Sequence, residues 1–167
     1  KIGNLYSNEL SFEASEIQIL DNGNKVKAID GAEILTDDGV KINAEKFEYS
    51  KINLILIAEG NVKVFDPINQ IIVNAPKIIY YKGKDIIVTE GKTTGTIKEI
   101  YNIATKNITI NRKIKKITSK NKTIINDNDD NIFEIMEFIY LGNEKLIKGK
   151  KISFVNNTKD EFFFEDA

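Results

Sequence analysis

The stretch "AEKFEYSKINLILIAEGNVKVFD", residues 44–66, decides the fold. Apolar and polar residues alternate on both sides of the polar segment "SKIN", which predicts a turn between two strands. Because successive side chains of a strand point to opposite faces, this pattern predicts a β-hairpin with one apolar face. That face is unusually complete for a chain with 29% charged residues, and it requires a second sheet layer, a partner protein or a lipid to cover it.

In the second strand of this hairpin, alternate positions differ clearly in polarity. One parity is uniformly apolar or small, and we expect it to face the inside: Leu54, Leu56, Ala58, Gly60, Val62 and Val64. The other parity, which includes Lys63 and Phe65, is expected to face outward. The small residues Ala58 and Gly60 fit either tight packing of two sheet halves or room for a lipid chain.

Strand signals and turn signals alternate along the whole chain, and no segment has a sustained helical period. The segment "IFEIMEFIYL", residues 132–141, is also expected to be a strand. When Ala14, Ala44, Ala75, Ala104 and Ile135 are aligned, the spacings are 30, 31, 29 and 31 residues. The chain is therefore predicted to contain about five two-strand units, with a sixth beginning at "FFFEDA", residues 162–167. Strands joined by such short turns are antiparallel neighbours.

The apolar phase also changes within a unit, which predicts that each strand bends. Ile42 and Ala44 have one parity, whereas Phe47 and Tyr49 have the other, as expected for a bulge or corner. Glycine follows "AE" at Gly60 and "TE" at Gly91, where it permits a sharp bend. The sequence thus predicts an all-β fold in which a bent antiparallel sheet has an apolar inside and a charged outside.

Composition excludes several classes of function. The net charge of −1 provides no broad cationic field, so no nucleic-acid partner is expected. The chain has no Cys and no His, which removes the usual zinc, haem and iron–sulfur ligands and all His-based catalysis. We therefore expect no metal, no cofactor and no enzymatic activity.

Two polar segments are candidate binding sites. "DNDDN", residues 127–131, resembles the start of a calcium loop, but it lacks the required Gly and Glu and is predicted to be a solvated turn. "NRKIKKITSKNK", residues 111–122, is the one basic run and could contact lipid phosphates or nucleic acid. We expect it to form the polar outer face of two strands, since Ile114 and Ile117 interrupt it.

The segment "INAEKFEYSKINLILIAEGNVKVFDPINQIIVNAPKIIYY", residues 42–81, resembles the repeat of the OstA-like domain. That domain occurs in the lipopolysaccharide transport proteins LptA and LptC and in the periplasmic N-terminal part of LptD. The residues that match its pattern are Ala44, Glu45, Phe47, Tyr49, Ala58, Gly60, Asn61, Val62, Asp66, Ala75 and Tyr80. The match is good over residues 42–91, recognisable over 12–42 and weaker over 101–167.

The opening "FEASEIQILDNGNKVKAIDGAEI", residues 12–34, is most similar to the start of the LptD-type domain, and a stand-alone LptA-like protein is the alternative. The resemblance implies that residues 1–167 form a single open β-jellyroll, a bent or taco-like sheet excised from a longer chain. It implies a periplasmic location, attached to the outer membrane. It also implies that lipopolysaccharide acyl chains lie in an apolar groove and pass toward the outer membrane without catalysis.

The resemblance further implies partners. These are other OstA-like domains joined by edge-strand pairing and, for the LptD type, an outer-membrane barrel and its lipoprotein. The apolar N-terminal stretch "LYSNELSFEASEI", residues 5–17, has no visible cap, so it predicts either such docking or a missing upstream cap.

From the apolar pattern together with the resemblance, the predicted lining of the lipid groove is Phe47, Tyr49, Leu54, Leu56, Ala58, Val62, Val64, Val73, Ile78 and Tyr80. The competing hypothesis is a structural or adhesive β-solenoid with a closed core and no lipid ligand. An open interior separates the two.

Overall fold

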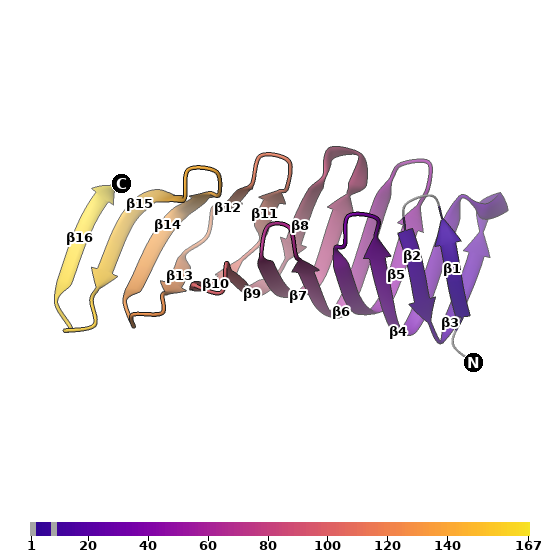
Figure 1. The fold of residues 1–167 in the computed structure, drawn as a ribbon, viewed down its shortest axis with the longest axis horizontal. Helices are drawn as coiled ribbons and strands as arrows, with labels where there is room; N and C mark the ends of the chain where they lie inside the picture. Colours follow the sequence, from indigo (N-terminus) through magenta and orange to yellow (C-terminus); the bar gives the residue numbers. More distant parts are fainter. Residues whose placement is uncertain (1–2, 8–9) are drawn as a thin grey trace.

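The computed structural model describes residues 3–7 and 10–167, and it describes side chains from Leu10 onward. In this part of the chain a 16-stranded antiparallel sheet forms the whole framework, which confirms the all-β, jellyroll-like prediction. Figure 1 shows the strands following one another along the long axis, with the two termini at opposite ends. Two single turns of 3-10 helix, η1 (Asp21–Gly23) and η2 (Lys82–Lys84), interrupt the strands.

The strands are β1 (Gly3–Ser7), β2 (Leu10–Ala14), β3 (Glu16–Leu20), β4 (Lys25–Thr36), β5 (Lys41–Ser50), β6 (Ile55–Asp66), β7 (Ile71–Tyr81), β8 (Ile86–Glu90), β9 (Lys92–Ile97), β10 (Tyr101–Lys106), β11 (Ile108–Asn111), β12 (Lys116–Ser119), β13 (Thr123–Asn126), β14 (Ile132–Leu141), β15 (Leu146–Val155) and β16 (Glu161–Asp166). The predicted strand at residues 132–141 is confirmed by β14.

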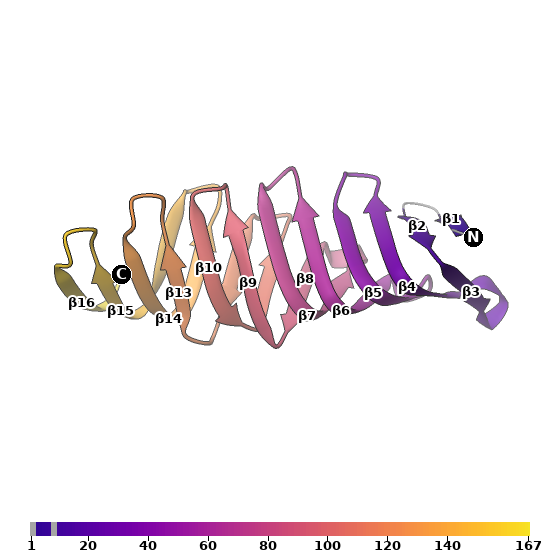
Figure 2. The ribbon, with the colours of Figure 1, turned by 90° about the horizontal axis from the view of Figure 1, so that it is seen from below.

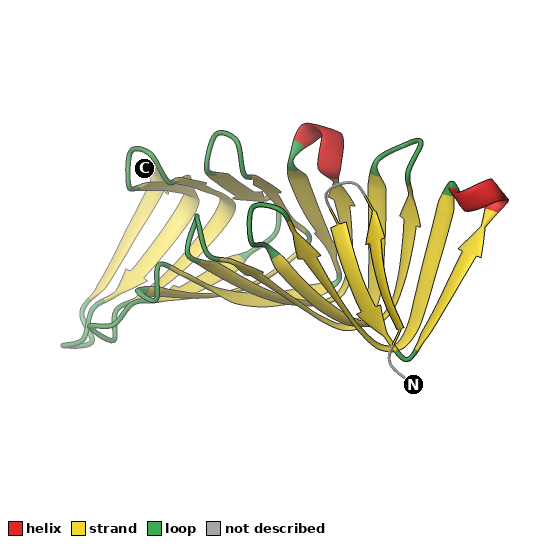
Figure 3. Ribbon diagram, turned by 45° about the vertical axis from the view of Figure 1, so that its right-hand side comes forward, coloured by secondary structure: helices red, strands yellow, loops and turns green. Residues whose placement is uncertain are grey.

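The sheet folds lengthwise into two walls that share a bend. Wall A comprises residues 16–20, 25–29, 46–50, 55–59, 77–81, 86–90, 108–111, 116–119, 138–141 and 146–148. Wall B comprises residues 3–7, 10–14, 32–36, 41–44, 62–66, 71–75, 92–97, 101–106, 123–126, 132–135, 152–155 and 161–164. Figure 2 shows neighbouring strands side by side along the length, and Figure 3 shows the walls diverging from the bend.

Bulges produce the bend, as the change of apolar phase predicts. The pairing register breaks between Asn43 and Lys46 in β5 and between Glu59 and Val62 in β6. At the bend of β6, Gly60 has a φ of +83°, a conformation that costs little only for glycine. The next unit bends at Gly91, with a φ of +90°, so both predicted glycine bends are confirmed.

The inner residues beside the bend change character along the chain. In the first half they are alanines, whose small side chains allow the walls to approach closely: Ala14, Ala32, Ala44, Ala58 and Ala75. In the second half they are buried hydroxyl residues: Thr89, Thr93, Thr105, Ser119 and Thr123. These hydroxyls bond to one another, with 2.7 Å between Thr89 Oγ1 and Thr93 Oγ1 and 3.1 Å between Thr105 Oγ1 and Ser119 Oγ. Small hydrogen-bonded hydroxyl residues thus take the place of alanine beside the bend. This is why the recurring alanine of the sequence pattern is weaker over residues 101–167.

One apolar cluster fills the space between the walls from Leu10 to Ile152. In β6 the inward residues after the turn are Leu56, Ala58, Val62 and Val64, whereas Phe65 is exposed. The predicted parity is therefore confirmed at these four inward residues. It is wrong for Gly60, which is half-buried in the bulge and whose missing side chain would point at Glu45.

Candidate functional site: the interior and its mouth

The predicted lining residues lie in the core with one exception. Nine of them are at most 3% exposed: Phe47, Tyr49, Leu56, Ala58, Val62, Val64, Val73, Ile78 and Tyr80. The prediction for Leu54 is wrong, because its side chain is 39% exposed. Leu54 ends the turn before β6 and has a φ of +54°, so it does not continue the alternation of the strand.

The nine buried residues come from both walls. Phe47, Leu56 and Ile78 belong to wall A, and Val62 and Val73 belong to wall B. Their side chains fill the space between the walls, as in an ordinary core. A ligand can therefore reach these residues only if the walls move apart, so the free edges of the walls are part of the candidate site.

The free edges carry the turns, and the long opening between them is called the mouth here. Arg112, in the turn between β11 and β12, spans the mouth. Its Nε donates to Asp66 Oδ2 at 2.7 Å, and one of its terminal nitrogens donates to Asp38 Oδ2 at 2.6 Å. Both acceptors belong to wall B, with Asp66 at the end of β6 and Asp38 in the turn after β4. Its other terminal nitrogen donates to Asp85 Oδ1 at 2.5 Å on its own side.

Tyr80 and two neighbours complete this cluster. The Tyr80 hydroxyl donates to Asp85 Oδ1 at 3.0 Å and accepts a bond from Arg112 at 3.4 Å. Asn69 donates through Nδ2 to Asp66 Oδ2 at 2.7 Å, and the Thr36 hydroxyl donates to Asp38. We call the group of Arg112, Asp38, Asp66 and Asp85 the clasp.

Ionisation in the clasp is governed by burial and by the guanidinium. Burial alone would raise the pKa of the Asp66 carboxyl, but the bonds from Arg112 and Asn69 outweigh it, so the pKa lies below its usual value. The same opposition leaves the pKa of Asp38 lowered. Burial raises the pKa of the Tyr80 hydroxyl, and the adjacent Asp85 raises it further. All three carboxylates therefore face a permanent cation at neutral pH.

The clasp corrects one expectation for the basic run at residues 111–122. Ile114 and Lys113 are exposed, as an outer polar face requires, but Arg112 is buried. Sequence reasoning did not identify its role. The available signal was its identity as the only arginine in a chain rich in lysine, at a place where one side chain must bind several carboxylates.

A cavity of about 270 Å³ opens beside the clasp and is called the mouth cavity here. Its floor consists of buried core residues from both walls, namely Ile71 of β7, Ile110 of β11 and Tyr140 of β14. Its other lining residues are Ile68, Asn69, Gln70, Lys98, Asn111, Arg112, Lys115 and Gly142. The cavity thus borders the apolar core at its floor and has a polar, cationic rim.

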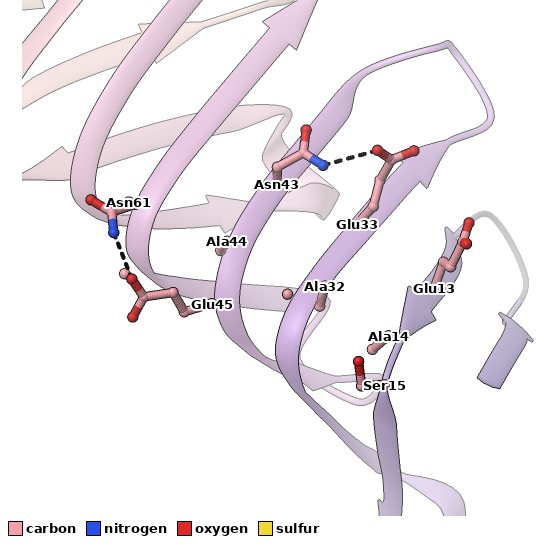
Figure 4. A pocket seen from close by; sticks show the side chains of 11 residues that line it. Glu13, Ala14, Ser15, Ala32, Glu33, Asn43, Ala44, Glu45 and Asn61 are labelled. Atoms are coloured by element: carbon pink, nitrogen blue, oxygen red, sulfur yellow. Dashed lines mark hydrogen bonds between the residues drawn. The ribbon is translucent and has the colours of Figure 1, made fainter. Parts of the chain in front are cut away.

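A larger cavity, of about 480 Å³, lies along the bend (Figure 4). Its polar groups are already paired in part, since Asn43 Nδ2 donates to Glu33 Oε2 at 2.9 Å and Asn61 Nδ2 donates to Glu45 Oε1 at 2.6 Å. It contains none of the predicted lining residues. It is a feature of the bulged bend rather than an entrance to the interior.

Other kinds of site find no support in the described part of the chain. Among its residues, no three carboxylate, His or Cys side chains are placed to hold a metal ion. Asp127 is bonded by the backbone N–H groups of Asp129 and Asn131, so the segment 127–131 is an internally capped turn. No helix of the described residues is long and apolar enough to cross a membrane.

Comparison with protein-family models and with curated proteins gives no match for this chain.

Proposed function

We propose that this domain binds lipopolysaccharide in the periplasm, shields its acyl chains between walls A and B, and passes them toward the outer membrane. The carrying observation is the way in which the walls are joined. Strands cross from one wall to the other at the bend, and backbone hydrogen bonds between turns run along each wall. Examples are Lys98 N to Gln70 O at 2.7 Å in wall B and Gly142 N to Lys115 O at 2.7 Å in wall A.

Because the strand ladders lie within the walls, opening the mouth need not break them. The walls can separate around the bend when the clasp is released and the inner apolar faces part. Acyl chains then replace the contacts that the faces made with each other. Burial of a chain contributes about 0.8 kcal/mol per CH₂, so one chain of about twelve carbons offsets roughly 9 kcal/mol of lost wall-to-wall contact.

The proposed partners follow from the edges of the sheet. Among the described strands, β3 pairs only with β4, and β16 pairs only with β15. Ile19 near one end and Phe163 near the other are largely exposed. Exposed strand edges recruit further strands. Other OstA-like domains, or the barrel and lipoprotein of an LptD-type assembly, are the proposed neighbours. The docking prediction for residues 5–17 includes Asn8 and Glu9, which lie outside the described residues.

Site-specific photo-crosslinking tests the lipid proposal. A photoreactive amino acid replaces Leu56, which is fully buried, or Lys63, which is exposed on the same strand. Each protein is irradiated with lipopolysaccharide and analysed on a gel. The proposal expects crosslinking at Leu56 and none at Lys63. A folded Leu56 variant that gives no crosslink contradicts it.

A closed structural or adhesive β-solenoid is the second candidate function. The specific observation in its favour is the filled interior, held across the mouth by the clasp. In that role the repeat builds length and the core never receives a ligand. The Leu56 crosslink distinguishes the two candidates directly.

A further inference from the structure

The mouth cavity holds polar groups without partners, in contrast to the clasp beside it. Tyr140 is only 4% exposed, yet its hydroxyl makes no hydrogen bond with any described residue. The equivalent Tyr80 of an earlier unit, also buried, is bonded to Asp85 and Arg112. The buried unpaired atoms of the described residues do not include this hydroxyl, so it is accessible from the cavity that Tyr140 lines and can donate to a ligand group there.

A second atom at the cavity also has no partner, and this one is fully buried. Asn69 Oδ1 is buried and has no partner among the described residues, whereas Asn69 Nδ2 is held by Asp66. This oxygen accepts a bond from a hydroxyl or N–H group. Two independent polar atoms of the lining, one from each wall, therefore await a partner in the same cavity.

The charged residues of the lining are all cationic. Lys98, Lys115 and Arg112 line the cavity, and no Asp or Glu of the described chain does. The three carboxylates of the clasp bond the guanidinium but are not among the lining residues, so they lie behind it. Neither Lys98 nor Lys115 has an ion pair with a described residue, unlike Lys25, which pairs with Glu48 at 3.0 Å. Their ammonium groups are free for an anion.

The floor of the cavity indicates that the ligand also has an apolar part. Ile71, Ile110 and Tyr140 belong to the continuous core cluster, and Ile68 on the rim is exposed. A ligand that uses both the floor and the rim has an apolar part directed between the walls and an anionic part at the mouth. From this arrangement we infer that the mouth cavity binds the anionic headgroup of an amphiphile, such as a phosphate monoester, through Lys98 and Lys115. The Tyr140 hydroxyl donates a further bond to it. This inference rests on the proposed lipid function, because that function supplies the place for the apolar chain.

Two detergents of equal chain length separate the headgroup from the chain. Dodecyl phosphate and dodecyl maltoside are each titrated below their micelle concentrations, with calorimetry as the readout. We expect dodecyl phosphate to bind about tenfold or more tightly, since bonds to a charged group contribute about 1.5–3 kcal/mol. Inorganic phosphate alone is expected not to compete at the same concentration. Equal binding of inorganic phosphate and dodecyl phosphate overturns the amphiphile assignment.

Matched variants localise the effect. The double variant Lys98→Ala/Lys115→Ala is expected to bind dodecyl phosphate no more tightly than dodecyl maltoside. Its affinity for dodecyl maltoside is expected to equal that of the wild type. The control Lys113→Ala/Lys120→Ala removes the same charge from exposed residues that do not line the cavity, and it is expected to keep the preference. Tyr140→Phe keeps the ring in place but removes the hydroxyl, and it is expected to weaken the binding of dodecyl phosphate several-fold.

The outcomes separate the two proposals. If both detergents bind equally and the lysine variants change nothing, the headgroup site is wrong and the lipid function stands. If neither detergent binds the folded wild-type protein, the lipid function fails and the headgroup site falls with it.

Discussion

Arg112 and Asp66 meet across the mouth of the folded sheet, with 2.7 Å between Arg112 Nε and Asp66 Oδ2 and with both side chains only 3% exposed. The residues are 46 positions apart in the sequence. Their contact joins the free edges of two walls that otherwise share the bend and an apolar core. In the proposed function it is therefore the place where opening of the interior is controlled.

Replacing Arg112 by Leu is expected to destabilise the fold by about 3–5 kcal/mol, because Asp66 is left buried without its cation. Urea denaturation measures the change. The control Lys113→Leu alters the adjacent exposed residue and is expected to change stability by less than about 0.5 kcal/mol. If Arg112→Leu is as stable as the control, the clasp does not hold the walls together.

The clasp also predicts how stability depends on pH. The folded pKa values of Asp66 and Asp38 lie below their ordinary value of 3.8, so near pH 4 the unfolded chain binds more protons than the folded one. Their contribution is present above about pH 4 and is lost as the pH falls through the lowered values. Urea denaturation of the wild type between pH 7 and pH 2.5 is expected to show this loss.

In Arg112→Leu the pKa of the Asp66 carboxyl is expected to rise relative to the wild type, because burial still raises it and only the bonds from Asn69 oppose burial. As the pH falls toward this higher pKa, protonation of Asp66 is expected to relieve part of the destabilisation. The difference in stability between variant and wild type then narrows. A gap that stays constant from pH 7 to pH 3 contradicts the buried ion pair.

The bend of β6 depends on glycine at residue 60. Gly60→Ala is expected to cost about 1–2 kcal/mol, because alanine is strained at a φ of +83° and its Cβ meets the Glu45 side chain. Gly83→Ala is the control, since Gly83 has no such φ and its added Cβ makes an ordinary contact with Leu54. Thermal unfolding of the pair measures the difference, and equal melting temperatures contradict a strained bend.

The hydroxyl residues of the second half are expected to be needed as hydroxyls. Thr89 Oγ1 accepts from Ile108 N at 2.9 Å and shares a bond with Thr93, and both threonines are fully buried. Thr89→Val keeps the shape but leaves that N–H unpaired, at a cost of about 1–3 kcal/mol. Thr96→Val, at a half-buried position on β9, is the control with a small expected effect. If both substitutions have only a small effect, the buried hydroxyl groups stabilise the fold by their volume and not by their hydrogen bonds.

Much of this fold is predictable from the sequence, because period-two alternation and its phase changes are local. The switch from Ile42 and Ala44 to Phe47 and Tyr49 marks the bend, and nine of the ten predicted lining residues lie inside. Leu54 fails for a local reason, since a left-handed residue at the end of a turn breaks the alternation that parity assumes.

The clasp, in contrast, could not be predicted from local sequence patterns. Arg112 binds carboxylates that lie 27, 46 and 74 residues away in the sequence, and no short sequence pattern predicts such contacts. Composition contains only a hint, a single arginine among many lysines. The mouth cavity is equally invisible, because it arises where turns of both walls come together.

The clasp has a consequence for how the molecule unfolds. In a stack of repeats, each unit contacts only its neighbours, so the chain can fray from either end in small steps. Arg112 connects turns that follow β4, β6, η2 and β11, and it thereby links four successive units through one side chain. The region from Asp38 to Arg112 is thus expected to open as one cooperative block, with uniform amide hydrogen exchange, while the units beyond it exchange progressively faster toward β16.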